Sequence, residues 1–432
     1  MDATPAVLLL DLPPDAMGGI NLLSFTTTSR FKGIKDLPTG WFHFVFTAST
    51  STLSVRHGVW FHIPRSLRPS QPPPLLVKKW DPQREDLVEA DETEKLRWRA
   101  NLGAIWKEGL TPYRQSASEE ATENSDWAQL TDCITAPILA RVTGGTKDHW
   151  GLSSASSTKR DMDEMPGLTA QESMFQPETE LDFLPIDLKQ TWREGATGRE
   201  RTEAAQDRSW ALGDVIEKHC QSEMDVLGEL QFCFIMVLTL NNYSCLEQWK
   251  RILSLLFTCK DATNTHPNLF IKAISTLRLQ LQHCQDDEGG LFDLTEDTLL
   301  GELLRRFRQG LEQLRGLEVQ DVMDELDDLE QCLKDTYGWQ MKTGAYANRG
   351  MLELEDGERV DMDAPVMYDP EYEEGEFAPA IVDLSPEQLK MLRPSSGTGD
   401  AHEATDTSSS EEEKDDSDEE DDRELAEMDS RY

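Results

Sequence analysis

Basic residues are scarce in this sequence. Its 432 residues include 42 Lys and Arg against 82 Asp and Glu, which gives a formal net charge of −40 at pH 7. Because phosphate contacts supply most non-specific affinity for nucleic acid, a chain this acidic is not expected to bind RNA directly unless a local basic patch exists. Arg305, Arg306 and Arg308 are the only dense cluster, and we favour their interpretation as the solvated face of a helix.

Regular cysteine spacing and long hydrophobic runs are also missing. The seven cysteines form no Cys-x-x-Cys pair, and no signal peptide precedes them. This pattern argues against a disulfide scaffold or a zinc site and favours a reducing compartment. The longest apolar run, Phe232 to Leu240, is far shorter than a membrane span. We therefore expect a soluble, intracellular protein without membrane contact.

No motif for catalysis or cofactor binding stands out. The segment TGGTK at 143–147 lacks the spaced first glycine of a P-loop and the strand that precedes one. His43, His57 and His62 have no Cys or carboxylate residues at the sequence spacing of a metal site. We therefore favour their interpretation as surface histidines or as hydrogen-bonded histidines within a sheet. There is no Gly-x-Ser-x-Gly motif, and no cysteine has a histidine-based activation context. We predict that the protein is not an enzyme and has no catalytic residue, metal site or cofactor.

Residues 1–140 predict a β-rich domain with a few helices, of the α+β class. Short β-branched and aromatic runs alternate with Pro and Gly, and Asp15, Gly18 and Gly19 supply turn chemistry. The expected strands are Ala6–Leu10, Gly40–Phe46, Val55–Ile63 and Leu75–Trp80, and the expected helices are Thr93–Trp106 and Trp127–Ile134.

Residues 141–178 are interpreted as a flexible linker, because from about residue 144 the sequence turns to Gly, Ser, Thr and charge without periodicity. A short strand-like piece follows at Leu181–Ile186.

Residues 179–340 predict an all-helical domain. The stretch 226–257 contains two apolar helices joined by a turn at Asn241 and Asn242, and Ser244 with Glu247 fits a capping box for the second. Further amphipathic helices are expected at Pro267–Cys284, Leu299–Leu314 and Val319–Leu333, with Gly310 and Gly316 marking a bend or a helix end. Such an array forms a superhelical or bundle-like domain.

Residues 341–432 predict a largely disordered acidic tail with one apolar stretch, FAPAIVDL at 377–384. This stretch has the composition of a strand that adds to a partner's sheet edge, although a chance apolar run in a disordered tail is the alternative. The predicted partner-binding residues are Phe377, Ile381, Val382 and Leu384. Four serines precede an acid by three residues and are candidate phosphorylation sites, namely Ser408, Ser409, Ser410 and Ser417.

Two distant segments resemble the Aar-two splicing-factor family. The first is DVLGELQ at 225–231 with LEQWKR at 246–251, and the second is FKGIKDLPTGWFHF at 31–44. Weaker similarity to the family occurs in four further segments, VLLLDLPPDAMGGIN near the start, RHGVWFHI, LLVKKWDPQREDLV and APAIVDLSPE. The resemblance covers most of the chain except residues 144–178 and the last forty or so.

The resemblance implies two domains, the second an all-α superhelix of VHS-like type. It also implies a non-catalytic assembly chaperone of the U-five small nuclear ribonucleoprotein in pre-mRNA splicing. Such a chaperone binds the RNase-H-like and Jab/MPN-like domains of the spliceosomal core protein Prp-eight and blocks premature helicase and RNA binding. It is expected in the cytoplasm, shuttling to the nucleus. A trafficking or signalling adaptor is the main alternative, because fold does not fix function. A second alternative is an enzyme whose active-site residues are too far apart in the sequence to form a recognisable motif.

Overall fold

The computed structural model describes residues 4–49, 54–65, 72–114, 125–145, 150–164, 179–284 and 299–339, and the backbone of 351–353 and 359–361. Residues Met1–Ala347 form one compact unit, and Asn348–Tyr432 form a second. In the second unit, β11 (Met351–Glu353) pairs antiparallel with β12 (Arg359–Asp361). The rest of the predicted tail lies outside the described residues.

Two five-stranded sheets dominate the N-terminal region, as the sequence predicts. The first has the strand order β8-β7-β1-β4-β9 and the second β10-β6-β5-β2-β3. The strands are β1 (Ala6–Leu10), β2 (Met17–Ile20), β3 (Leu23–Thr26), β4 (Gly33–Lys35), β5 (Phe42–Ala48), β6 (His57–His62), β7 (Leu75–Asp81), β8 (Asp86–Glu89), β9 (Leu110–Pro112) and β10 (Trp150–Ser153).

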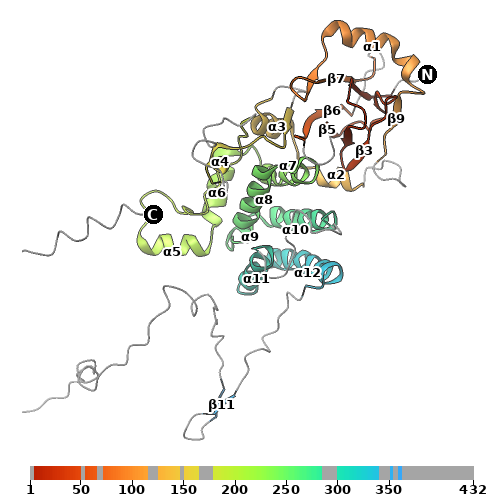
Figure 1. Cartoon of the computed structure of the whole chain (residues 1–432). Helices are drawn as coiled ribbons and strands as arrows, with labels where there is room; N and C mark the ends of the chain where they lie inside the picture. Colours follow the sequence, from red (N-terminus) through yellow and green to blue (C-terminus); the bar gives the residue numbers. More distant parts are fainter. Residues whose placement is uncertain are drawn as a thin grey trace, which may run out of the picture. The chain divides into compact units, whose positions relative to one another are not determined.

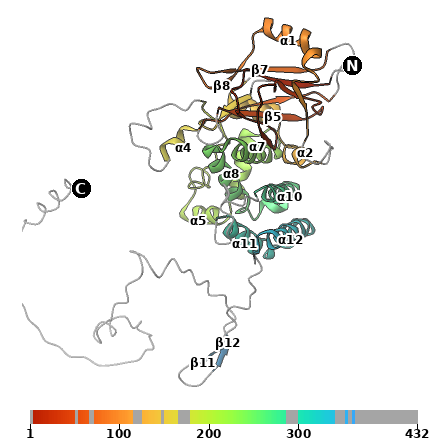
Figure 2. The same ribbon diagram turned by 45° about the vertical axis from the view of Figure 1, so that its right-hand side comes forward.

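Side-chain alternation along the strands places these sheets between two helical layers. On β1, Val7 and Leu9 belong to the core between the sheets, whereas Leu8 and Leu10 belong to the core beneath α1 (Glu92–Ile105). On β5, Val45 faces the first sheet and Phe44 faces the helical region. Both views show α1 on the side of the sheets away from the other long helices (Figures 1 and 2).

Two glycines let aromatic rings lie flat across the second sheet. A Cβ on Gly19 would meet the Phe46 ring at 2.1 Å, and one on Gly58 would meet the Phe44 ring at 2.1 Å. Gly18 and Gly19 therefore lie inside β2 and not in the turn that their type predicts, because neighbouring rings occupy the space of a side chain. Asp15 does lie in a turn, with φ 59°.

The interpretation of residues 141–178 as a flexible linker is wrong for 150–164. Strand β10 pairs antiparallel with β6, with Trp150 opposite Trp60, and α4 (Lys159–Glu164) follows it. Trp150 and Leu152 are buried in the core shared with the helices. A Gly- and Ser-rich composition hides this strand, because pairing with β6 and not local propensity fixes it. Residues 165–178 lie outside the described part of the chain.

The predicted helices of the C-terminal region are confirmed, with ends that differ by at most four residues from the prediction. Helix α7 spans Met224–Leu240, α8 Tyr243–Leu256, α10 Pro267–Gln282, α11 Leu299–Glu312 and α12 Leu317–Tyr337. Smaller helices that the sequence reasoning missed are α3 (Ala136–Thr143), α5 (Gly198–Gln206), α6 (Ser209–His219) and α9 (Ala262–Thr265), and α2 covers only Asp126–Leu130. Gly316 caps α12, whereas Gly310 lies within α11.

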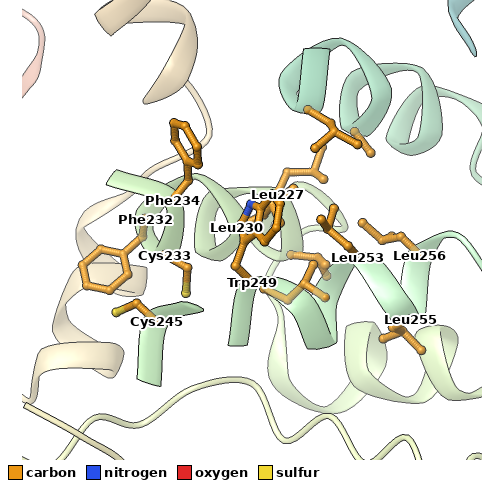
Figure 3. Close-up of a cluster of buried hydrophobic side chains, with 14 of the residues drawn as sticks. Leu227, Leu230, Phe232, Cys233, Phe234, Cys245, Trp249, Leu253, Leu255 and Leu256 are labelled. Carbon is orange, nitrogen blue, oxygen red and sulfur yellow. The ribbon is translucent and has the colours of Figure 1, made fainter. Parts of the chain in front are cut away.

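The turn between α7 and α8 forms at the predicted asparagines, but the predicted capping box is wrong. Asn241 ends α7 in the left-handed region, and the Asn242 side chain accepts a hydrogen bond from the Cys245 N–H. Ser244 already lies inside the helix, and its hydroxyl lies 2.6 Å from that of Ser157. The two helices bury their facing apolar side chains against each other (Figure 3).

Gly228 marks the closest approach between α7 and the N-terminal region. An added Cβ would meet the Cys133 carbonyl oxygen at 2.3 Å, so we expect Gly228→Ala to lower the free energy of unfolding by about 1–3 kcal/mol. Gly213→Ala in α6 is the matched control, because a Cβ there meets nothing within 4 Å and should stabilise by about 0.5–1 kcal/mol. Urea unfolding compares the two. Equal effects would contradict the close packing.

Candidate partner-binding platform

The second sheet and the helical region share one hydrophobic core. The Trp60 ring on β6 stacks on Trp127 of α2 at 5.8 Å and lies 6.0 Å from Phe232 of α7. All three side chains are buried. Arg56 adds a polar contact, donating to the carbonyl oxygen of Thr239 near the C-terminus of α7 at 3.0 Å. The N-terminal region and the helices therefore form one body.

Residues 181–186 cross this body as an extended strap. The predicted strand at Leu181–Ile186 is not confirmed, because this segment belongs to neither sheet: the Leu181 and Asp182 N–H groups donate to the Ser157 and Val142 carbonyl oxygens, and Leu184 bonds to side chains of α7 and α8. The Leu184 N–H donates to the Glu229 carboxylate at 3.0 and 3.1 Å, and its carbonyl accepts from Gln248 Nε2 at 3.0 Å. The apolar side chains of the strap point into the shared core. The strap therefore ties α7 and α8 to the segment before them.

Glu229 is the electrostatic centre of this arrangement. Its side chain is fully buried, and it accepts hydrogen bonds from Gln248 Nε2 at 2.8 Å and Arg141 Nη2 at 2.7 Å. Burial raises the pKa of the Glu229 carboxyl, and the ion pair with Arg141 opposes that shift. A carboxylate with this many donors is a structural anchor, so Glu229 joins α3, α7, α8 and the strap.

Gln231 of α7 and Arg251 of α8 also connect elements that are distant in the sequence. The Gln231 side-chain amide donates to Asp132 at 2.7 Å and accepts from the Cys133 N–H at 2.9 Å. Arg251 of α8 forms a buried ion pair with Asp161 of α4. The segments DVLGELQ and LEQWKR thus contribute side chains that hold elements of the fold together.

The segment FKGIKDLPTGWFHF is structural in the same sense. His43 is buried between the sheets, where Nε2 lies 3.0 Å from the Pro38 carbonyl oxygen and Nδ1 lies 3.2 Å from Asn21 Nδ2. Desolvation lowers the pKa of His43 to about 4, so the ring is neutral at pH 7. His57 pairs with Asp86 at 2.9 Å and joins the two sheets. The interpretation of both as satisfied sheet histidines is confirmed.

His43 should make the fold acid-sensitive. Its folded pKa lies below the unfolded value of 6.5, so its contribution is complete above pH 6.5 and is lost as pH falls toward about 4. We expect the free energy of unfolding of the wild type to fall by about 3 kcal/mol more than that of His43→Gln between pH 7 and pH 4. Denaturant titrations at both values measure the difference. Parallel losses in the two proteins would refute this role.

Two of the three clustered arginines form ion pairs with nearby carboxylates. Arg306 pairs with Glu302 one turn away, and Arg308 of α11 pairs with Asp327 and Glu330 of α12. Arg308 is held in a network between helices and is mostly buried. The interpretation as the solvated face of a helix holds for Arg306, whereas Arg308 lies in an ion-pair network between α11 and α12.

The other motifs that the sequence singled out have structural roles. Gly144 of the TGGTK segment is the left-handed C-cap of α3, and Lys147 lies outside the described residues. Burial raises the pKa of Cys133 and Cys284 to about 12, so both stay thiols at neutral pH. Phe377, Ile381, Val382, Leu384 and the four tail serines lie outside the described residues, so the structure does not place them.

A shallow pocket lies between α2 and α10. It has a volume of about 190 Å³ and is lined by polar groups that include Lys272, Arg278 and Thr276. Lys272 pairs with Asp132 at 2.5 Å, and Arg278 pairs with Glu325 at 2.8 Å. The buried Thr276 hydroxyl has no hydrogen-bond partner within the described parts of the chain.

Among the described residues, none of the helices has the length and apolarity needed to cross a bilayer. The same residues contain no group of three or more His, Cys, Asp or Glu side chains arranged to hold a metal ion. The described residues therefore define an α+β protein in which two β-sheets and a helical region share one hydrophobic core.

Comparison with known proteins identifies the family. The AAR2 N-terminal domain matches residues 3–144, and the AAR2 C-terminal repeat region matches residues 183–342. The chain is 30% identical to the human Protein AAR2 homolog over 302 residues, covering 64% of this chain and 74% of that protein. The orangutan homologue gives the same values. The yeast A1 cistron-splicing factor AAR2 is 23% identical over 264 residues, covering 58% and 69%. The chain belongs to the AAR2 family, the Aar-two family of the sequence resemblance.

Proposed function

We propose that the protein is a non-catalytic splicing factor that acts as an assembly chaperone of the U-five small nuclear ribonucleoprotein. Its partner is Prp-eight, contacted through the RNase-H-like and Jab/MPN-like domains. Membership of the AAR2 family carries this proposal, because a member in yeast is named as a splicing factor. Bound in this way, the chain blocks helicase and RNA from Prp-eight until the particle matures.

The shared core supports a chaperone role on physical grounds. A body whose two regions are joined by Trp60, Glu229 and the strap meets a large partner without first ordering its own domains. Pre-ordering of this kind lowers the entropic cost of association. A superhelical, VHS-like arrangement of the helices, cytoplasmic residence with shuttling to the nucleus, and phosphorylation of the tail serines belong to the same proposal.

Affinity purification of the full chain from cells tests this function. We expect Prp-eight as a stoichiometric partner, together with other U-five proteins. Recovery of cargo-sorting or receptor proteins in its place would favour the adaptor alternative, and recovery of the chain alone would remove the proposal.

The apolar tail segment gives a sharper prediction. Replacing Ile381 and Val382 by Asp should weaken Prp-eight binding at least tenfold, because two apolar anchors of the added strand become charged. Ala401→Asp with Thr405→Asp adds the same charge outside the segment and should leave affinity unchanged. Calorimetric titration compares the two double variants. Equal affinities would retire the donor-strand role.

A further inference from the structure

The charge of the chain is distributed unevenly. Residues 4–114 hold 14 Lys and Arg against 11 Asp and Glu, although the whole chain carries a net charge of −40. Six of these cations make no ion pair with any described residue, namely Arg30, Lys32, Arg97, Arg99, Lys107 and Arg114. The sequence alone did not reveal this group, because its members are spread over 85 positions and no two are adjacent.

The fold brings four of the six to one edge of the first sheet. Strands β4 and β9 lie side by side at this edge, with Gly33 opposite Leu110. The Lys32 N–H donates to the Gly109 carbonyl oxygen at 2.8 Å, which places Lys32 opposite Gly109, two residues after Lys107. At the other end of the pair, the Tyr113 N–H donates to the Lys35 carbonyl oxygen at 2.8 Å, and Arg114 is the next residue along the chain.

Lys35 joins the two ends of this edge. Its Nζ donates to the Trp106 carbonyl oxygen at 2.6 Å and lies 5.4 Å from the centre of the Trp106 ring. Arg30 lies two residues before Lys32, in the turn that precedes β4. Arg97 and Arg99 are exposed on α1 and continue the charge about 15 Å along the helix from Lys107. We call Arg30, Lys32, Lys107 and Arg114, together with Lys35, the cationic edge.

Only two acids accompany the cationic edge in sequence, Asp36 and Glu108. Asp36 accepts a hydrogen bond from the Thr4 hydroxyl at 2.6 Å and forms no ion pair with a described cation. The edge therefore carries a local positive charge. At physiological ionic strength, charges more than about 8 Å away are largely screened, so distant acidic residues weaken this local field without cancelling it.

We propose that the cationic edge binds the phosphate backbone of single-stranded RNA without sequence preference. Exposed charge pairs with an acidic peptide contribute only about 0–1 kcal/mol each, so a surface of this kind holds such a peptide poorly. Nucleic acid carries condensed counterions, and their release makes binding by cations alone favourable. This surface is distinct from the Arg305–Arg308 cluster and does not depend on any contact with Prp-eight.

Fluorescence anisotropy of a labelled 20-nucleotide oligouridine tests the proposal with the full chain. We expect weak binding at 50 mM salt that falls by about two orders of magnitude at 200 mM, because about five phosphate contacts give a slope near −3.5 in log K against log salt. Arg30, Lys32, Lys107 and Arg114 changed together to Gln should lose at least tenfold in affinity and flatten this slope. Lys35 is left unchanged because it also supports α1.

A matched control separates this surface from net charge. Lys159, Lys189, Arg315 and Lys334 are exposed cations with no ion pair to any described residue, and changing all four to Gln alters the net charge equally. The control protein should bind the RNA like the wild type. Equal losses in the two variants, no binding by the wild type at 50 mM salt, or stronger competition by polyglutamate than by unlabelled RNA would each overturn the proposal.

Discussion

Glu229→Ala should lower the free energy of unfolding by about 3 kcal/mol or more. The substitution removes the acceptor for the Leu184 N–H and the Gln248 amide, and it leaves Arg141, whose side chain is only 24% exposed, without its carboxylate. Glu229→Gln keeps an acceptor and the side-chain volume, so it should lose less. Urea unfolding measures both.

Glu203→Ala is the control for this loss. Glu203 forms an exposed ion pair with Arg199 on α5, and pairs of this kind contribute little. We expect a change within about 0.5 kcal/mol. If Glu229→Ala were as mild as the control, the strap would not be anchored in the way the hydrogen bonds indicate.

Trp60→Ala should cost about 3–5 kcal/mol, because it opens a cavity where the second sheet meets α2 and α7. The number of unfolding transitions in this variant is more informative than the size of its stability loss. Since Trp60 belongs to the core that both regions share, calorimetry should show one transition, moved as a whole to lower temperature.

Trp210→Ala provides the comparison, because this Trp is 45% exposed on α6 and its loss should change stability by less than about 1 kcal/mol. Two separate transitions in Trp60→Ala, with only one of them shifted, would show that the N-terminal region and the helices unfold independently. That result would also remove the pre-ordering argument for the chaperone role.

Local periodicity explains which parts of the fold the sequence could predict. Helices α7 and α8 follow from apolar residues at spacings of three and four, and the asparagine pair between them ends α7 at Asn241 and caps the start of α8 at Asn242. The strands β1, β5, β6 and β7 follow in the same way from β-branched and aromatic runs. In each case the signal lies within a few residues of the structure it predicts.

Tertiary contacts decided the parts that the sequence reasoning missed. Ser244 was the expected helix cap, but its hydroxyl forms a hydrogen bond with that of Ser157 in a distant segment. Asn242 caps α8 in its place. Strand β10 pairs with residues at least 90 positions away, and the strap bonds to residues at least 24 positions away, which no local pattern contains. The cationic edge has the same origin, since only the pairing of β4 with β9 assembles it.

The structure does not test the predicted partner-binding site in the tail. Phe377, Ile381, Val382 and Leu384 lie outside the described residues, so their role rests on sequence and family resemblance. The structure adds one constraint, because the two family signature segments are committed to internal contacts through Glu229, Gln231 and His43. We therefore expect the partner surface to consist of exposed residues and to include few of these signature positions.

The proposed function requires that the protein cover a surface of Prp-eight. The most direct test mixes the purified full chain with the purified RNase-H-like and Jab/MPN-like domains and measures both complex formation and RNA binding by those domains. We predict a stoichiometric complex in which the domains no longer bind RNA. Folded domains that form no complex, or a complex that binds RNA as well as the free domains do, would contradict the account.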